Sequence, residues 1–373
     1  MSRFDVAHVS SAHPWTDNRV HLREAAGLAA AGWRVLLVAV ESDVSVGPTD
    51  VTVRRIRRRP RFRRLVCGSV EAVWHGYRSG APVLHLHDPE LVWAIPLLRL
   101  LGRTVVFDAH EDLPNQVRTK AYLGGLGTLL ARVAAAALVR IAGTADRVIA
   151  ATDAIAARFD ADRTVVVRNF PRLRPEDTAG GRRDDTVVFI GALDVNRGAD
   201  VLARVVQAPA FPDGWRLRIA GPIRPAGLRD DFEAGRAAGR VELLGMLAPA
   251  AARQLLSTAR VGVVTLLPTP AHLDSLPTKL FEYMAAGLAV VASDFPLWRR
   301  LLAGHDCVTF VDPTDADAIA AAVARYAADP AMLARQSVAA ASAARSTFNW
   351  DSEERRLVAL YDGLRPSTSG VRR

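Results

Sequence analysis

The segment FDVAHVSSAHPWTDNRVHLREAAGLAAAGWRVLLVAV (residues 4–40) decides the fold, because it contains one complete strand–helix–strand unit. Residues 4–10 form a short apolar run typical of a buried strand, and residues 33–40 form a second one. Between them, residues 18–32 have a helical pattern that ends at Gly32. Near-continuous Val, Ile and Leu strands joined by helices are typical of a parallel sheet that is covered on both faces.

The same alternation continues on both sides of one irregular segment, RNFPRLRPEDTAGGRRDD (residues 168–185), which has the composition of a linker. Further strands are predicted at residues 51–56, 82–87, 104–110 and 147–152 before it, and at 185–191, 215–221, 240–245, 260–266, 288–293 and 307–311 after it. We therefore predict an α/β protein with two doubly wound, Rossmann-like parallel-sheet domains, residues 1–172 and 173–349. Because ligands bind at the carboxyl ends of such strands, we expect the domains to face a central cleft.

The bulk composition is that of a soluble globular protein, with 50% hydrophobic and 23% charged residues among 373. No apolar run reaches the ~20 residues of a membrane span, and the N-terminus lacks the pattern of a secretory signal. Cys67 and Cys307 form no metal or redox motif, so we interpret them as reduced core thiols. These features predict a cytoplasmic protein.

The chain carries a net charge of +9, which favours anionic partners. The run from Arg54 to Arg64 holds eight arginines in eleven residues. Two interpretations remain open, a solvated loop and a patch for an anionic surface. Phe62, Leu65 and Val66 tilt the balance towards peripheral contact with the inner face of a membrane. Nucleic acid is not expected as a partner, because no recognisable binding module accompanies the arginines.

Motifs of several common enzyme classes are missing from the sequence. The first strand–helix turn contains no glycine, so a nicotinamide or flavin cofactor is not expected, and neither GxxxxGK[ST] nor GxSxG occurs. The Asp–Ala–Asp triplets at 160–162 and 315–317 are interpreted as structural rather than as metal ligands. His85 and His87 lie at a strand end without a partner at a recognised metal-ligand spacing. We therefore predict neither a metal nor a cofactor.

The segment DSLPTKLFEYMAAG (residues 274–287) carries the clearest functional signal. Pro277 and Gly287 predict a helix that runs from about Leu276 to Ala286. A helix N-terminus at the carboxyl end of a sheet binds anions, and a diphosphate is the natural guest. The backbone amides expected to point at this anion are those of Ser275, Leu276 and Thr278.

Lys279 is one of only two lysines in a chain rich in arginine, the other being Lys120. It lies in the first helical turn, where a cation opposes the helix dipole, so it needs a compensating anion. That anion is either Glu282, three residues on, or a phosphate, and we favour the phosphate. Glu282 is then suited to ribose hydroxyls, and Asp274 to the hydroxyls of a sugar.

Two further strand ends carry candidate site residues. In FIGALDVNRGADVL (residues 189–202) the strand ends at Gly191 and the following loop carries Arg197, although alone this is an ordinary connection. In VVFDAHEDLPNQ (residues 105–116) a strand ends near His110. The acidic neighbours of this histidine, suited to sugar hydroxyls or to holding the ring, are Asp108, Glu111 and Asp112.

Together these segments resemble the family-four retaining glycosyltransferases of the GT-B fold, in particular a bacterial subgroup that builds polysaccharides. Asp274 and Glu282, with seven residues between them, are similar to the family's Glu–x7–Glu motif. The other segments that carry the resemblance are HLHDPELVWAIPLL (85–98), VVFDAHEDLPNQV (105–117), VVVRNFP (165–171), VVFIGALDVNRG (187–198) and LPTKLFEYMAAGLAVVAS (276–293). The resemblance covers nearly the whole chain and implies that a last helix, residues 350–365, packs back on the first domain.

The resemblance implies transfer of a hexose from a UDP- or GDP-linked sugar to a glycan or lipid-linked acceptor, with retention and without a metal. Glu282 would bind the donor ribose, and Asp274 the donor sugar. Charge stabilisation at the diphosphate would replace a metal. The groups implied for it are the amides of Ser275 and Leu276, with Arg197 and Lys279, beside Gly191.

On the acceptor side, the resemblance implies that His110 acts near the donor sugar. It also implies that Asp17, Arg19 and Asp88 face the acceptor. The donor base would rest against residues 240–246.

The sequence departs from the family's pattern at two positions. Ala192 stands where the family usually has an arginine, which leaves Arg197 as the sole basic residue of that loop. We predict that Lys279 takes over the missing charge. Asp274 is one methylene shorter than the family's glutamate, so the donor sugar or the contacted hydroxyl should differ.

Two other functions remain open at this point. A nucleotide-sugar epimerase uses a similar two-domain fold, but it would need no acceptor groove. A binding protein without turnover would be expected to lose motif residues, and Lys279, Glu282, Asp274 and His110 are all present.

Overall fold

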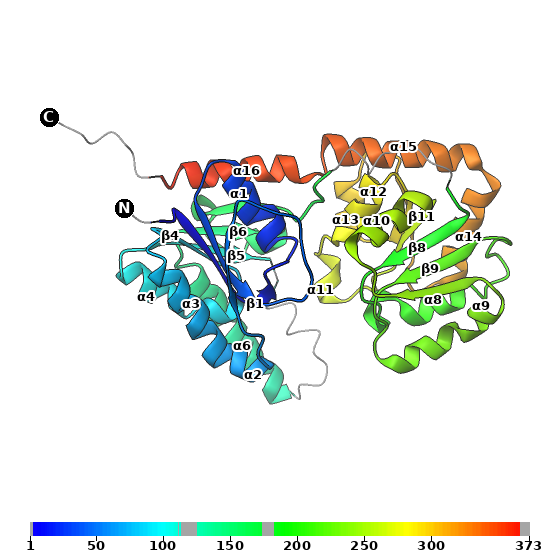
Figure 1. Ribbon diagram of the computed structural model, residues 1–373. Coiled ribbons are helices and arrows are strands. Elements are labelled where there is room, and N and C mark those ends of the chain that lie inside the picture. The colour runs from blue at the N-terminus through cyan, green and yellow to red at the C-terminus, as the bar shows by residue number, and fades with distance from the viewer. Residues whose placement is uncertain (1–2, 111, 113–124, 174–182, 366–373) are drawn as a thin grey trace. The chain divides into compact units, whose positions relative to one another are not determined.

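The computed structural model describes residues 3–110, 112, 125–173 and 183–365. The chain divides into two units (Figure 1): one combines Met1–Asn169 with Trp350–Arg373, and the other is Phe170–Asn349. The sequence places this boundary slightly later, between residues 172 and 173.

The first unit contains a parallel sheet of 7 strands in the order β3-β2-β1-β4-β5-β6-β7. The order reverses between β1 and β4, which makes their carboxyl ends the expected ligand-binding position. All six predicted strands are present, whereas β7 was missed because it is short and only partly buried. The strands are β1 Val6–Pro14, β2 Val35–Val40, β3 Thr52–Ile56, β4 Val83–Leu86, β5 Thr104–Ala109, β6 Arg147–Ala150 and β7 Thr164–Val166.

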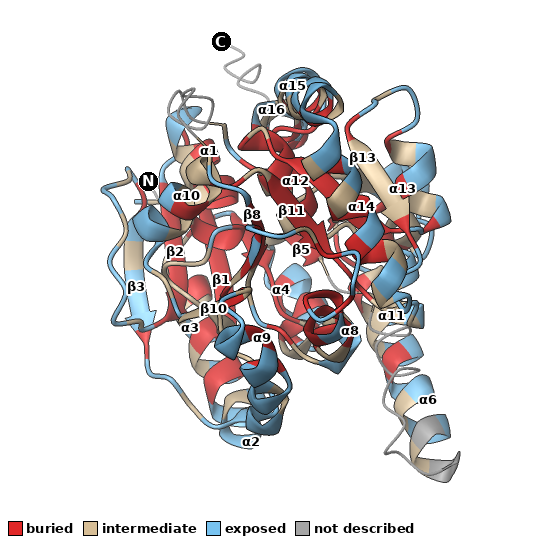
Figure 2. Ribbon diagram, turned by 90° about the vertical axis from the view of Figure 1, so that its right-hand side faces the viewer, coloured by how far each residue is buried: buried red, intermediate tan, exposed pale blue. Residues whose placement is uncertain are grey.

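Helices cover both faces of this sheet, and its central strands are buried, whereas the edge strand β3 is largely exposed (Figure 2). One face packs on α3 (Ser69–Arg78), α4 (Ala94–Leu100) and α6 (Gly125–Ala142). The other packs on the π-helical η1 (Val20–Ala25), on α1 (Ala26–Ala30) and on α16 (Trp350–Asp362). The shorter helical segments are α2 Arg61–Arg63, η2 Arg64–Gly68, η3 Pro89–Leu91, α7 Asp153–Ala156 and η4 Ala161–Arg163.

Helix α16 closes the first unit, although it comes last in the sequence. Its buried Trp350, Leu357 and Tyr361 belong to the same apolar cluster as Leu28 and Trp33 of the N-terminal strand–helix–strand segment. Figure 1 shows α16 alongside α1.

The second unit repeats the plan with a parallel sheet of 6 strands in the order β10-β9-β8-β11-β12-β13. All six strands predicted there are present. They are β8 Thr186–Ile190, β9 Arg216–Ala220, β10 Val241–Gly245, β11 Val261–Val264, β12 Ala289–Ser293 and β13 Val308–Val311. The helical segments are η6 Val195–Arg197, α8 Ala199–Val205, η7 Ala226–Phe232, α9 Glu233–Ala237, α10 Pro249–Thr258, α11 Pro270–Leu273, α12 Thr278–Ala285, α13 Pro296–Leu301, α14 Ala316–Ala328 and α15 Pro330–Ser346.

Two interpretations of the sequence are wrong in detail. Cys307 is buried as expected, but Cys67 is exposed and is not a core thiol. The arginine run is not a loop either. It begins in β3, passes through residues 57–60 and continues into α2 and η2.

Both Asp–Ala–Asp triplets cap helices, because the side chains of Asp160 and Asp315 accept backbone N–H groups at the helix starts.

Candidate functional site

Lys279 occupies an enclosed position between α12 and β8 in the second unit. Its Nζ lies 3.7 Å from the centre of the Phe189 ring, over the face of that β8 side chain. The Nζ is buried, and it has no hydrogen-bond partner among the described residues. Gly191, just after β8, lies next to it, because a Cβ at that position would stand 3.7 Å from the Nζ, an ordinary contact distance. The ammonium is therefore held by an aromatic face and lacks an anionic contact.

The charge of Lys279 is strongly disfavoured in the free protein. Burial lowers the pKa of Lys279 most, and repulsion by Arg197 lowers it further, while Glu282 and Asp194 oppose the change; the resulting pKa is about 7. Lys279 and Arg197 thus repel one another, and the carboxylates of Glu282 and Asp194 do not fully offset the effects of burial and repulsion. An anion bound between them would remove this repulsion and restore the lysine's charge.

Arg197 is positioned by its own short loop. Its guanidinium forms an ion pair with Asp194, whose side chain also caps η6 by accepting the backbone N–H of Arg197. Gly198 follows with a left-handed φ of 79°, and a Cβ there would come 2.7 Å from the carbonyl oxygen of Thr265. Only glycine fits that turn, so the loop is held against the end of β11. Arg197 remains partly exposed, with 39% of its side-chain surface accessible.

The start of α12 differs from the prediction. The helix begins at Thr278, with Pro277 as its N-cap rather than inside the first turn. The amide of Ser275 is not free, because it donates to the carbonyl oxygen of His272 at 3.0 Å. The Ser275 carbonyl in turn accepts from the Trp298 indole at 2.8 Å. Ser275 is therefore a structural anchor, and the amides available to an anion are those of Leu276 and the first helical turn.

The two acids of the motif occupy different environments, as predicted by their spacing. Asp274 follows α11 and is exposed, whereas Glu282 lies one turn into α12 and is partly buried. Helix α12 is fixed to the sheet by Tyr283, whose hydroxyl accepts the backbone N–H of Ile190 at 2.8 Å. This bond aligns the start of α12 with the end of β8. Residues 240–246, against which we expect the donor base to pack, contain β10 and end at the exposed Met246.

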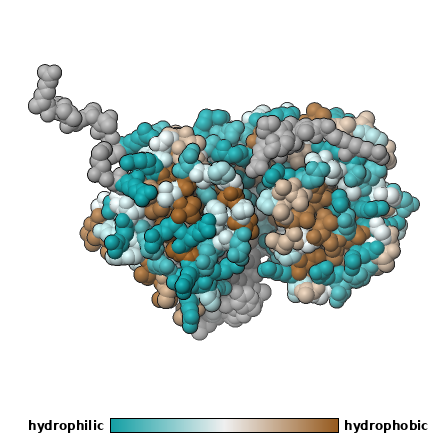
Figure 3. Space-filling model, viewed as in Figure 1, coloured by the Kyte–Doolittle hydropathy of each residue, from teal (hydrophilic) through white to brown (hydrophobic). Residues whose placement is uncertain are grey.

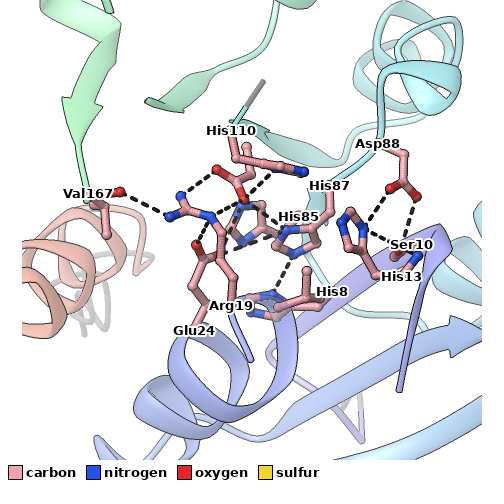
Figure 4. Close-up of polar contacts among 12 residues, drawn as sticks. His8, Ser10, His13, Arg19, Glu24, His85, His87, Asp88, His110 and Val167 are labelled. Atoms are coloured by element: carbon pink, nitrogen blue, oxygen red, sulfur yellow. Dashed lines mark hydrogen bonds and ion pairs between the residues drawn. The ribbon is translucent and has the colours of Figure 1, made fainter. Parts of the chain in front are cut away.

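In the first unit, His110 follows β5 and borders a small apolar cavity. Its Nδ1 lies 3.2 Å from Asp108, a fully buried carboxylate on the same strand. Asp108 also binds the Nε and Nη2 of Arg19, at 2.9 and 2.7 Å, and His87 at 3.2 Å (Figure 4). The ring of His110 is thus oriented by a carboxylate that is itself held by two other side chains. Glu111 lies outside the described residues, and Asp112 pairs with Arg158.

The three residues expected to face the acceptor have local partners instead. Arg19 is only 5% exposed, and its guanidinium is bound by Asp108 and by the Val167 carbonyl. Asp88 is 1% exposed. Asp17 accepts the backbone N–H groups of Arg19 and Val20, which caps the start of η1. Arg19 and Asp88 are therefore enclosed and have supporting positions, whereas Asp17 is partly exposed and its place on the acceptor side stays a prediction.

His13 is a candidate site residue that the sequence did not single out. It lies at the carboxyl end of β1, where Asp88 holds its Nδ1 at 2.8 Å. Burial opposes its charge, but the Asp88 carboxylate outweighs burial and raises the pKa of His13 to about 9. Its ring lies edge-on to that of His110, with centres 5.0 Å apart. Its position just after the first strand was the signal available in the sequence.

Four buried polar side chains lie behind His110, of which the sequence drew attention only to His85 and His87 and indicated no partner for them. His8, His85 and His87 point from β1 and β4 to one side of the sheet, where Glu24 of η1 meets them (Figure 4). Burial lowers the pKa of each of the three histidines. No spacing rule connects the four, because the parallel sheet brings together residues from three separate segments.

Both units match models of glycosyltransferase families. Residues 18–169 match the model described as "Glycosyl transferase 4-like domain", and residues 184–329 match "Glycosyl transferases group 1". The phosphatidyl-myo-inositol mannosyltransferase of Mycolicibacterium smegmatis is 32% identical over 200 residues, which are 51% of this chain and 49% of that protein. The chain thus spans about half the length of the curated relatives it matches.

Solved structures share the fold over nearly the whole chain. Sucrose-phosphate synthase from Thermosynechococcus elongatus matches with a TM-score of 0.75 and 20% identity, over 97% of this chain and 99% of that one. HepE from Anabaena, in complex with UDP and glucose, matches with a TM-score of 0.71 and 15% identity, over 96% and 99%. At identities this low, the matches show a common fold alone.

Proposed function

We propose, from the premise that this chain belongs to the family-four type of glycosyltransferases with the GT-B fold, that it transfers a hexose from a nucleotide sugar to a glycan or lipid-linked acceptor. We further propose that transfer retains the anomeric configuration and uses no metal. The observation that carries this proposal is Lys279, a buried ammonium repelled by Arg197, whose Nζ has no hydrogen-bond partner in the described part of the chain. The UDP complexes of the Anabaena protein and the lipid acceptor named for the mycobacterial relative support the substrate classes.

The diphosphate leaving group is the anion that these cations would receive. As the bond to the sugar breaks, negative charge grows on the diphosphate, and Lys279 and Arg197 would stabilise it in the way a metal does elsewhere. The amides at the start of α12 would add their dipoles. Glu282 would bind the ribose, and the exposed Asp274 the sugar. His110 is the group of the first unit that we propose to act on the sugar.

Kinetics of Lys279→Ala test this assignment. If the ammonium acts on the developing charge, turnover should fall by at least about 100-fold while the affinity for the nucleotide sugar changes much less. Arg204→Ala is the matched control, since this arginine of the second unit pairs only with its helical neighbour Asp200 on an exposed surface. An unchanged rate in the lysine variant would contradict the proposal.

A screen of nucleotide sugars distinguishes the alternatives. We expect release of UDP or GDP, and a product whose new bond has the anomeric configuration of the donor. Sugar inversion without an acceptor would instead indicate an epimerase. Thermal stabilisation without turnover of any donor–acceptor pair would indicate a binding protein.

We propose that the first unit contacts an anionic membrane through a surface on which exposed arginines lie next to exposed apolar side chains. Exposed apolar side chains follow one side of the α2–η2–α3 run, next to the exposed arginines. Figure 3 shows hydrophobic patches that interrupt the hydrophilic surface on this side of the unit. The apolar side chains are Phe62, Leu65, Val66, Val70 and Trp74. Among the described residues, no helix is both long and apolar enough to cross a bilayer.

Vesicle sedimentation tests the membrane contact. The protein should bind vesicles that contain phosphatidylglycerol and not vesicles of phosphatidylcholine alone, and added salt should weaken binding. Phe62→Ser should reduce binding, because its side chain is 78% exposed beside arginines. Val338→Ser, at an apolar residue 69% exposed in the second unit, should not. Equal binding to both vesicle types would refute the proposal.

A further inference from the structure

The four buried side chains behind His110 converge on one point. His8 and His85 are paired in the register of β1 and β4, and His87 lies two residues after His85, just past the end of β4. Glu24 reaches them from η1, and one donor atom from each residue lies within 4.8 Å of all the others. All four side chains are fully buried (Figure 4). Such convergence places three nitrogens and a carboxylate around a single small volume.

Several donor atoms of this cluster lack hydrogen bonds among the described residues. They include the Nε2 of His8, the Nε2 of His85 and both carboxylate oxygens of Glu24. The Nε of Arg19 approaches one of these oxygens to 3.0 Å, while the other lies 3.9 Å from His85. Buried polar atoms are nearly always hydrogen-bonded, so a group of unpaired ones in one place needs an explanation.

The charges of the region do not balance either. Arg19 is the one cation in contact with two buried carboxylates, Asp108 and Glu24. Its bidentate bonds go to Asp108, at 2.9 and 2.7 Å. With neutral histidines and an ionised Glu24, the cluster lacks one positive charge, and a buried unbalanced charge is strongly unfavourable.

One ring nitrogen of His85 and one of His87 already lie within hydrogen-bond distance of a neighbouring side chain, as is common for histidines that bind a metal. The hydroxyl of Tyr361, from α16, lies 2.9 Å from the Nδ1 of His85. Asp108 lies 3.2 Å from the Nδ1 of His87. The Nε2 of His85 points towards Glu24, 3.9 Å from its carboxylate, whereas His87 approaches the same oxygen with its Nδ1, also at 3.9 Å. The Nε2 of His87 lies 2.9 Å from the Nδ1 of His8. Ligating histidines commonly have this second bond, which fixes the ring and the tautomer.

We propose that His8, Glu24, His85 and His87 bind one divalent transition-metal ion, for which zinc is the best match. Three imidazole nitrogens and a carboxylate suit tetrahedral zinc, whose bonds of about 2.0–2.2 Å require the donor atoms to close in by small side-chain rotations. Four protein ligands in a buried position leave no open place for substrate, so the site is structural. The ion supplies the missing positive charge and ties β1, β4 and η1 together behind His110.

This inference departs from the sequence-based prediction of no metal, and it is independent of the proposed transfer reaction. The donor diphosphate would be bound by residues of the second unit, so transfer without a catalytic metal is unaffected. The test accordingly measures metal and stability rather than activity.

Metal content of the purified wild-type chain is the first measurement. Protein without a histidine tag is incubated with Zn²⁺, desalted, and analysed by mass spectrometry of the elements. We expect about one zinc per chain and a higher melting temperature than after exhaustive treatment with chelator. Replacement by Co²⁺ should give the visible absorption of a tetrahedral nitrogen–oxygen site. Substoichiometric zinc together with an unchanged melting temperature would overturn the proposal, and would leave a bound proton as the source of the charge.

A conservative variant assigns the ion to this cluster even if ligand variants fail to fold. Tyr361→Phe removes only the hydroxyl that orients His85, and loss of such a partner lowers metal affinity by roughly 10–100-fold. Tyr326→Phe is the matched control, because that buried hydroxyl bonds Gln336 in the second unit. Glu24→Gln should abolish stoichiometric binding. Zinc retained equally by all three variants would place the ion elsewhere, for instance at the exposed Cys67, and would refute the assignment.

Discussion

The two units treat buried charge in opposite ways. In the first, the Arg19 cation is enclosed by two carboxylates, Asp108 and Glu24, so this cation has partners. In the second, Lys279 is enclosed by an aromatic ring and repelled by Arg197. A partnered charge is part of the scaffold, and its loss should damage folding. An unpartnered charge is unfavourable until a ligand arrives, and its loss should damage function while favouring the fold.

The largest effect on stability is expected from Arg19→Met. This change leaves Asp108 and Glu24 buried without their cation, and breaking a buried pair in this way costs about 3–5 kcal/mol. Unfolding by urea measures the loss. Arg236→Met provides the control, since its pair with Glu233 is exposed and should contribute little. Similar stabilities for the two variants would mean that the first unit does not depend on its buried pair.

Lys279→Met should raise the free energy of unfolding of the protein without ligand, whereas Arg19→Met lowers it. The folded-state pKa of about 7 lies below the ordinary lysine value, so the folded chain binds fewer protons than the unfolded chain between the two. The wild type is therefore penalised fully below pH 7, and the penalty fades as the pH rises towards about 10.5. The variant should be more stable by on the order of 3 kcal/mol at pH 6.

Urea unfolding of both proteins from pH 6 to pH 10 checks this dependence. The gain should shrink steadily with pH, and saturating UDP or GDP should reduce it at pH 7, because the nucleotide favours the charged lysine. A variant less stable than the wild type at pH 6 would contradict the idea that the ammonium is uncompensated.

The smallest of these effects is expected from Gly191→Ala. Its φ of 116° disfavours a side chain, which costs about 1–2 kcal/mol. The added methyl group would also come into contact with the Lys279 ammonium, 3.7 Å from its Nζ. Gly304→Ala is the control, since Gly304 has a φ of 83° and open space around it. A loss of nucleotide affinity in the first variant alone would locate the anion beside Gly191, whereas equal affinities would separate that glycine from the site.

Much of the fold could be predicted because it depends on local pattern. Continuous apolar runs such as residues 33–40 form strands wherever helices cover both faces, and twelve predicted strands are present in the two sheets. The exception, β7, has three residues and no full pattern to recognise. The start of α12 was misplaced because Pro277 fits both the N-cap and the first turn, and only its extended backbone, with ψ of 126°, decides between them.

Only part of the candidate site could be predicted, because the sequence shows local patterns and not which residues become buried. Lys279, Arg197 and Glu282 lie within short motifs at strand ends, where chain position alone indicates a ligand site. Burial is not local, so the sequence could not show that Arg19 and Asp88 are enclosed. It could not show that the Lys279 ammonium lies over Phe189 either, because that ring comes from a strand 90 residues earlier.

By itself the sequence determined the two parallel sheets and the family and marked the segment that we propose to bind an anion, since each is encoded in contiguous residues. Only the tertiary structure decided which charges have partners. The pairing of β1 with β4 brings His8 beside His85 and His87, and η1 adds Glu24. Charge compensation depends on distances between segments that folding alone brings together. For that reason the lysine signal was visible in the motif, whereas the buried histidine cluster was not.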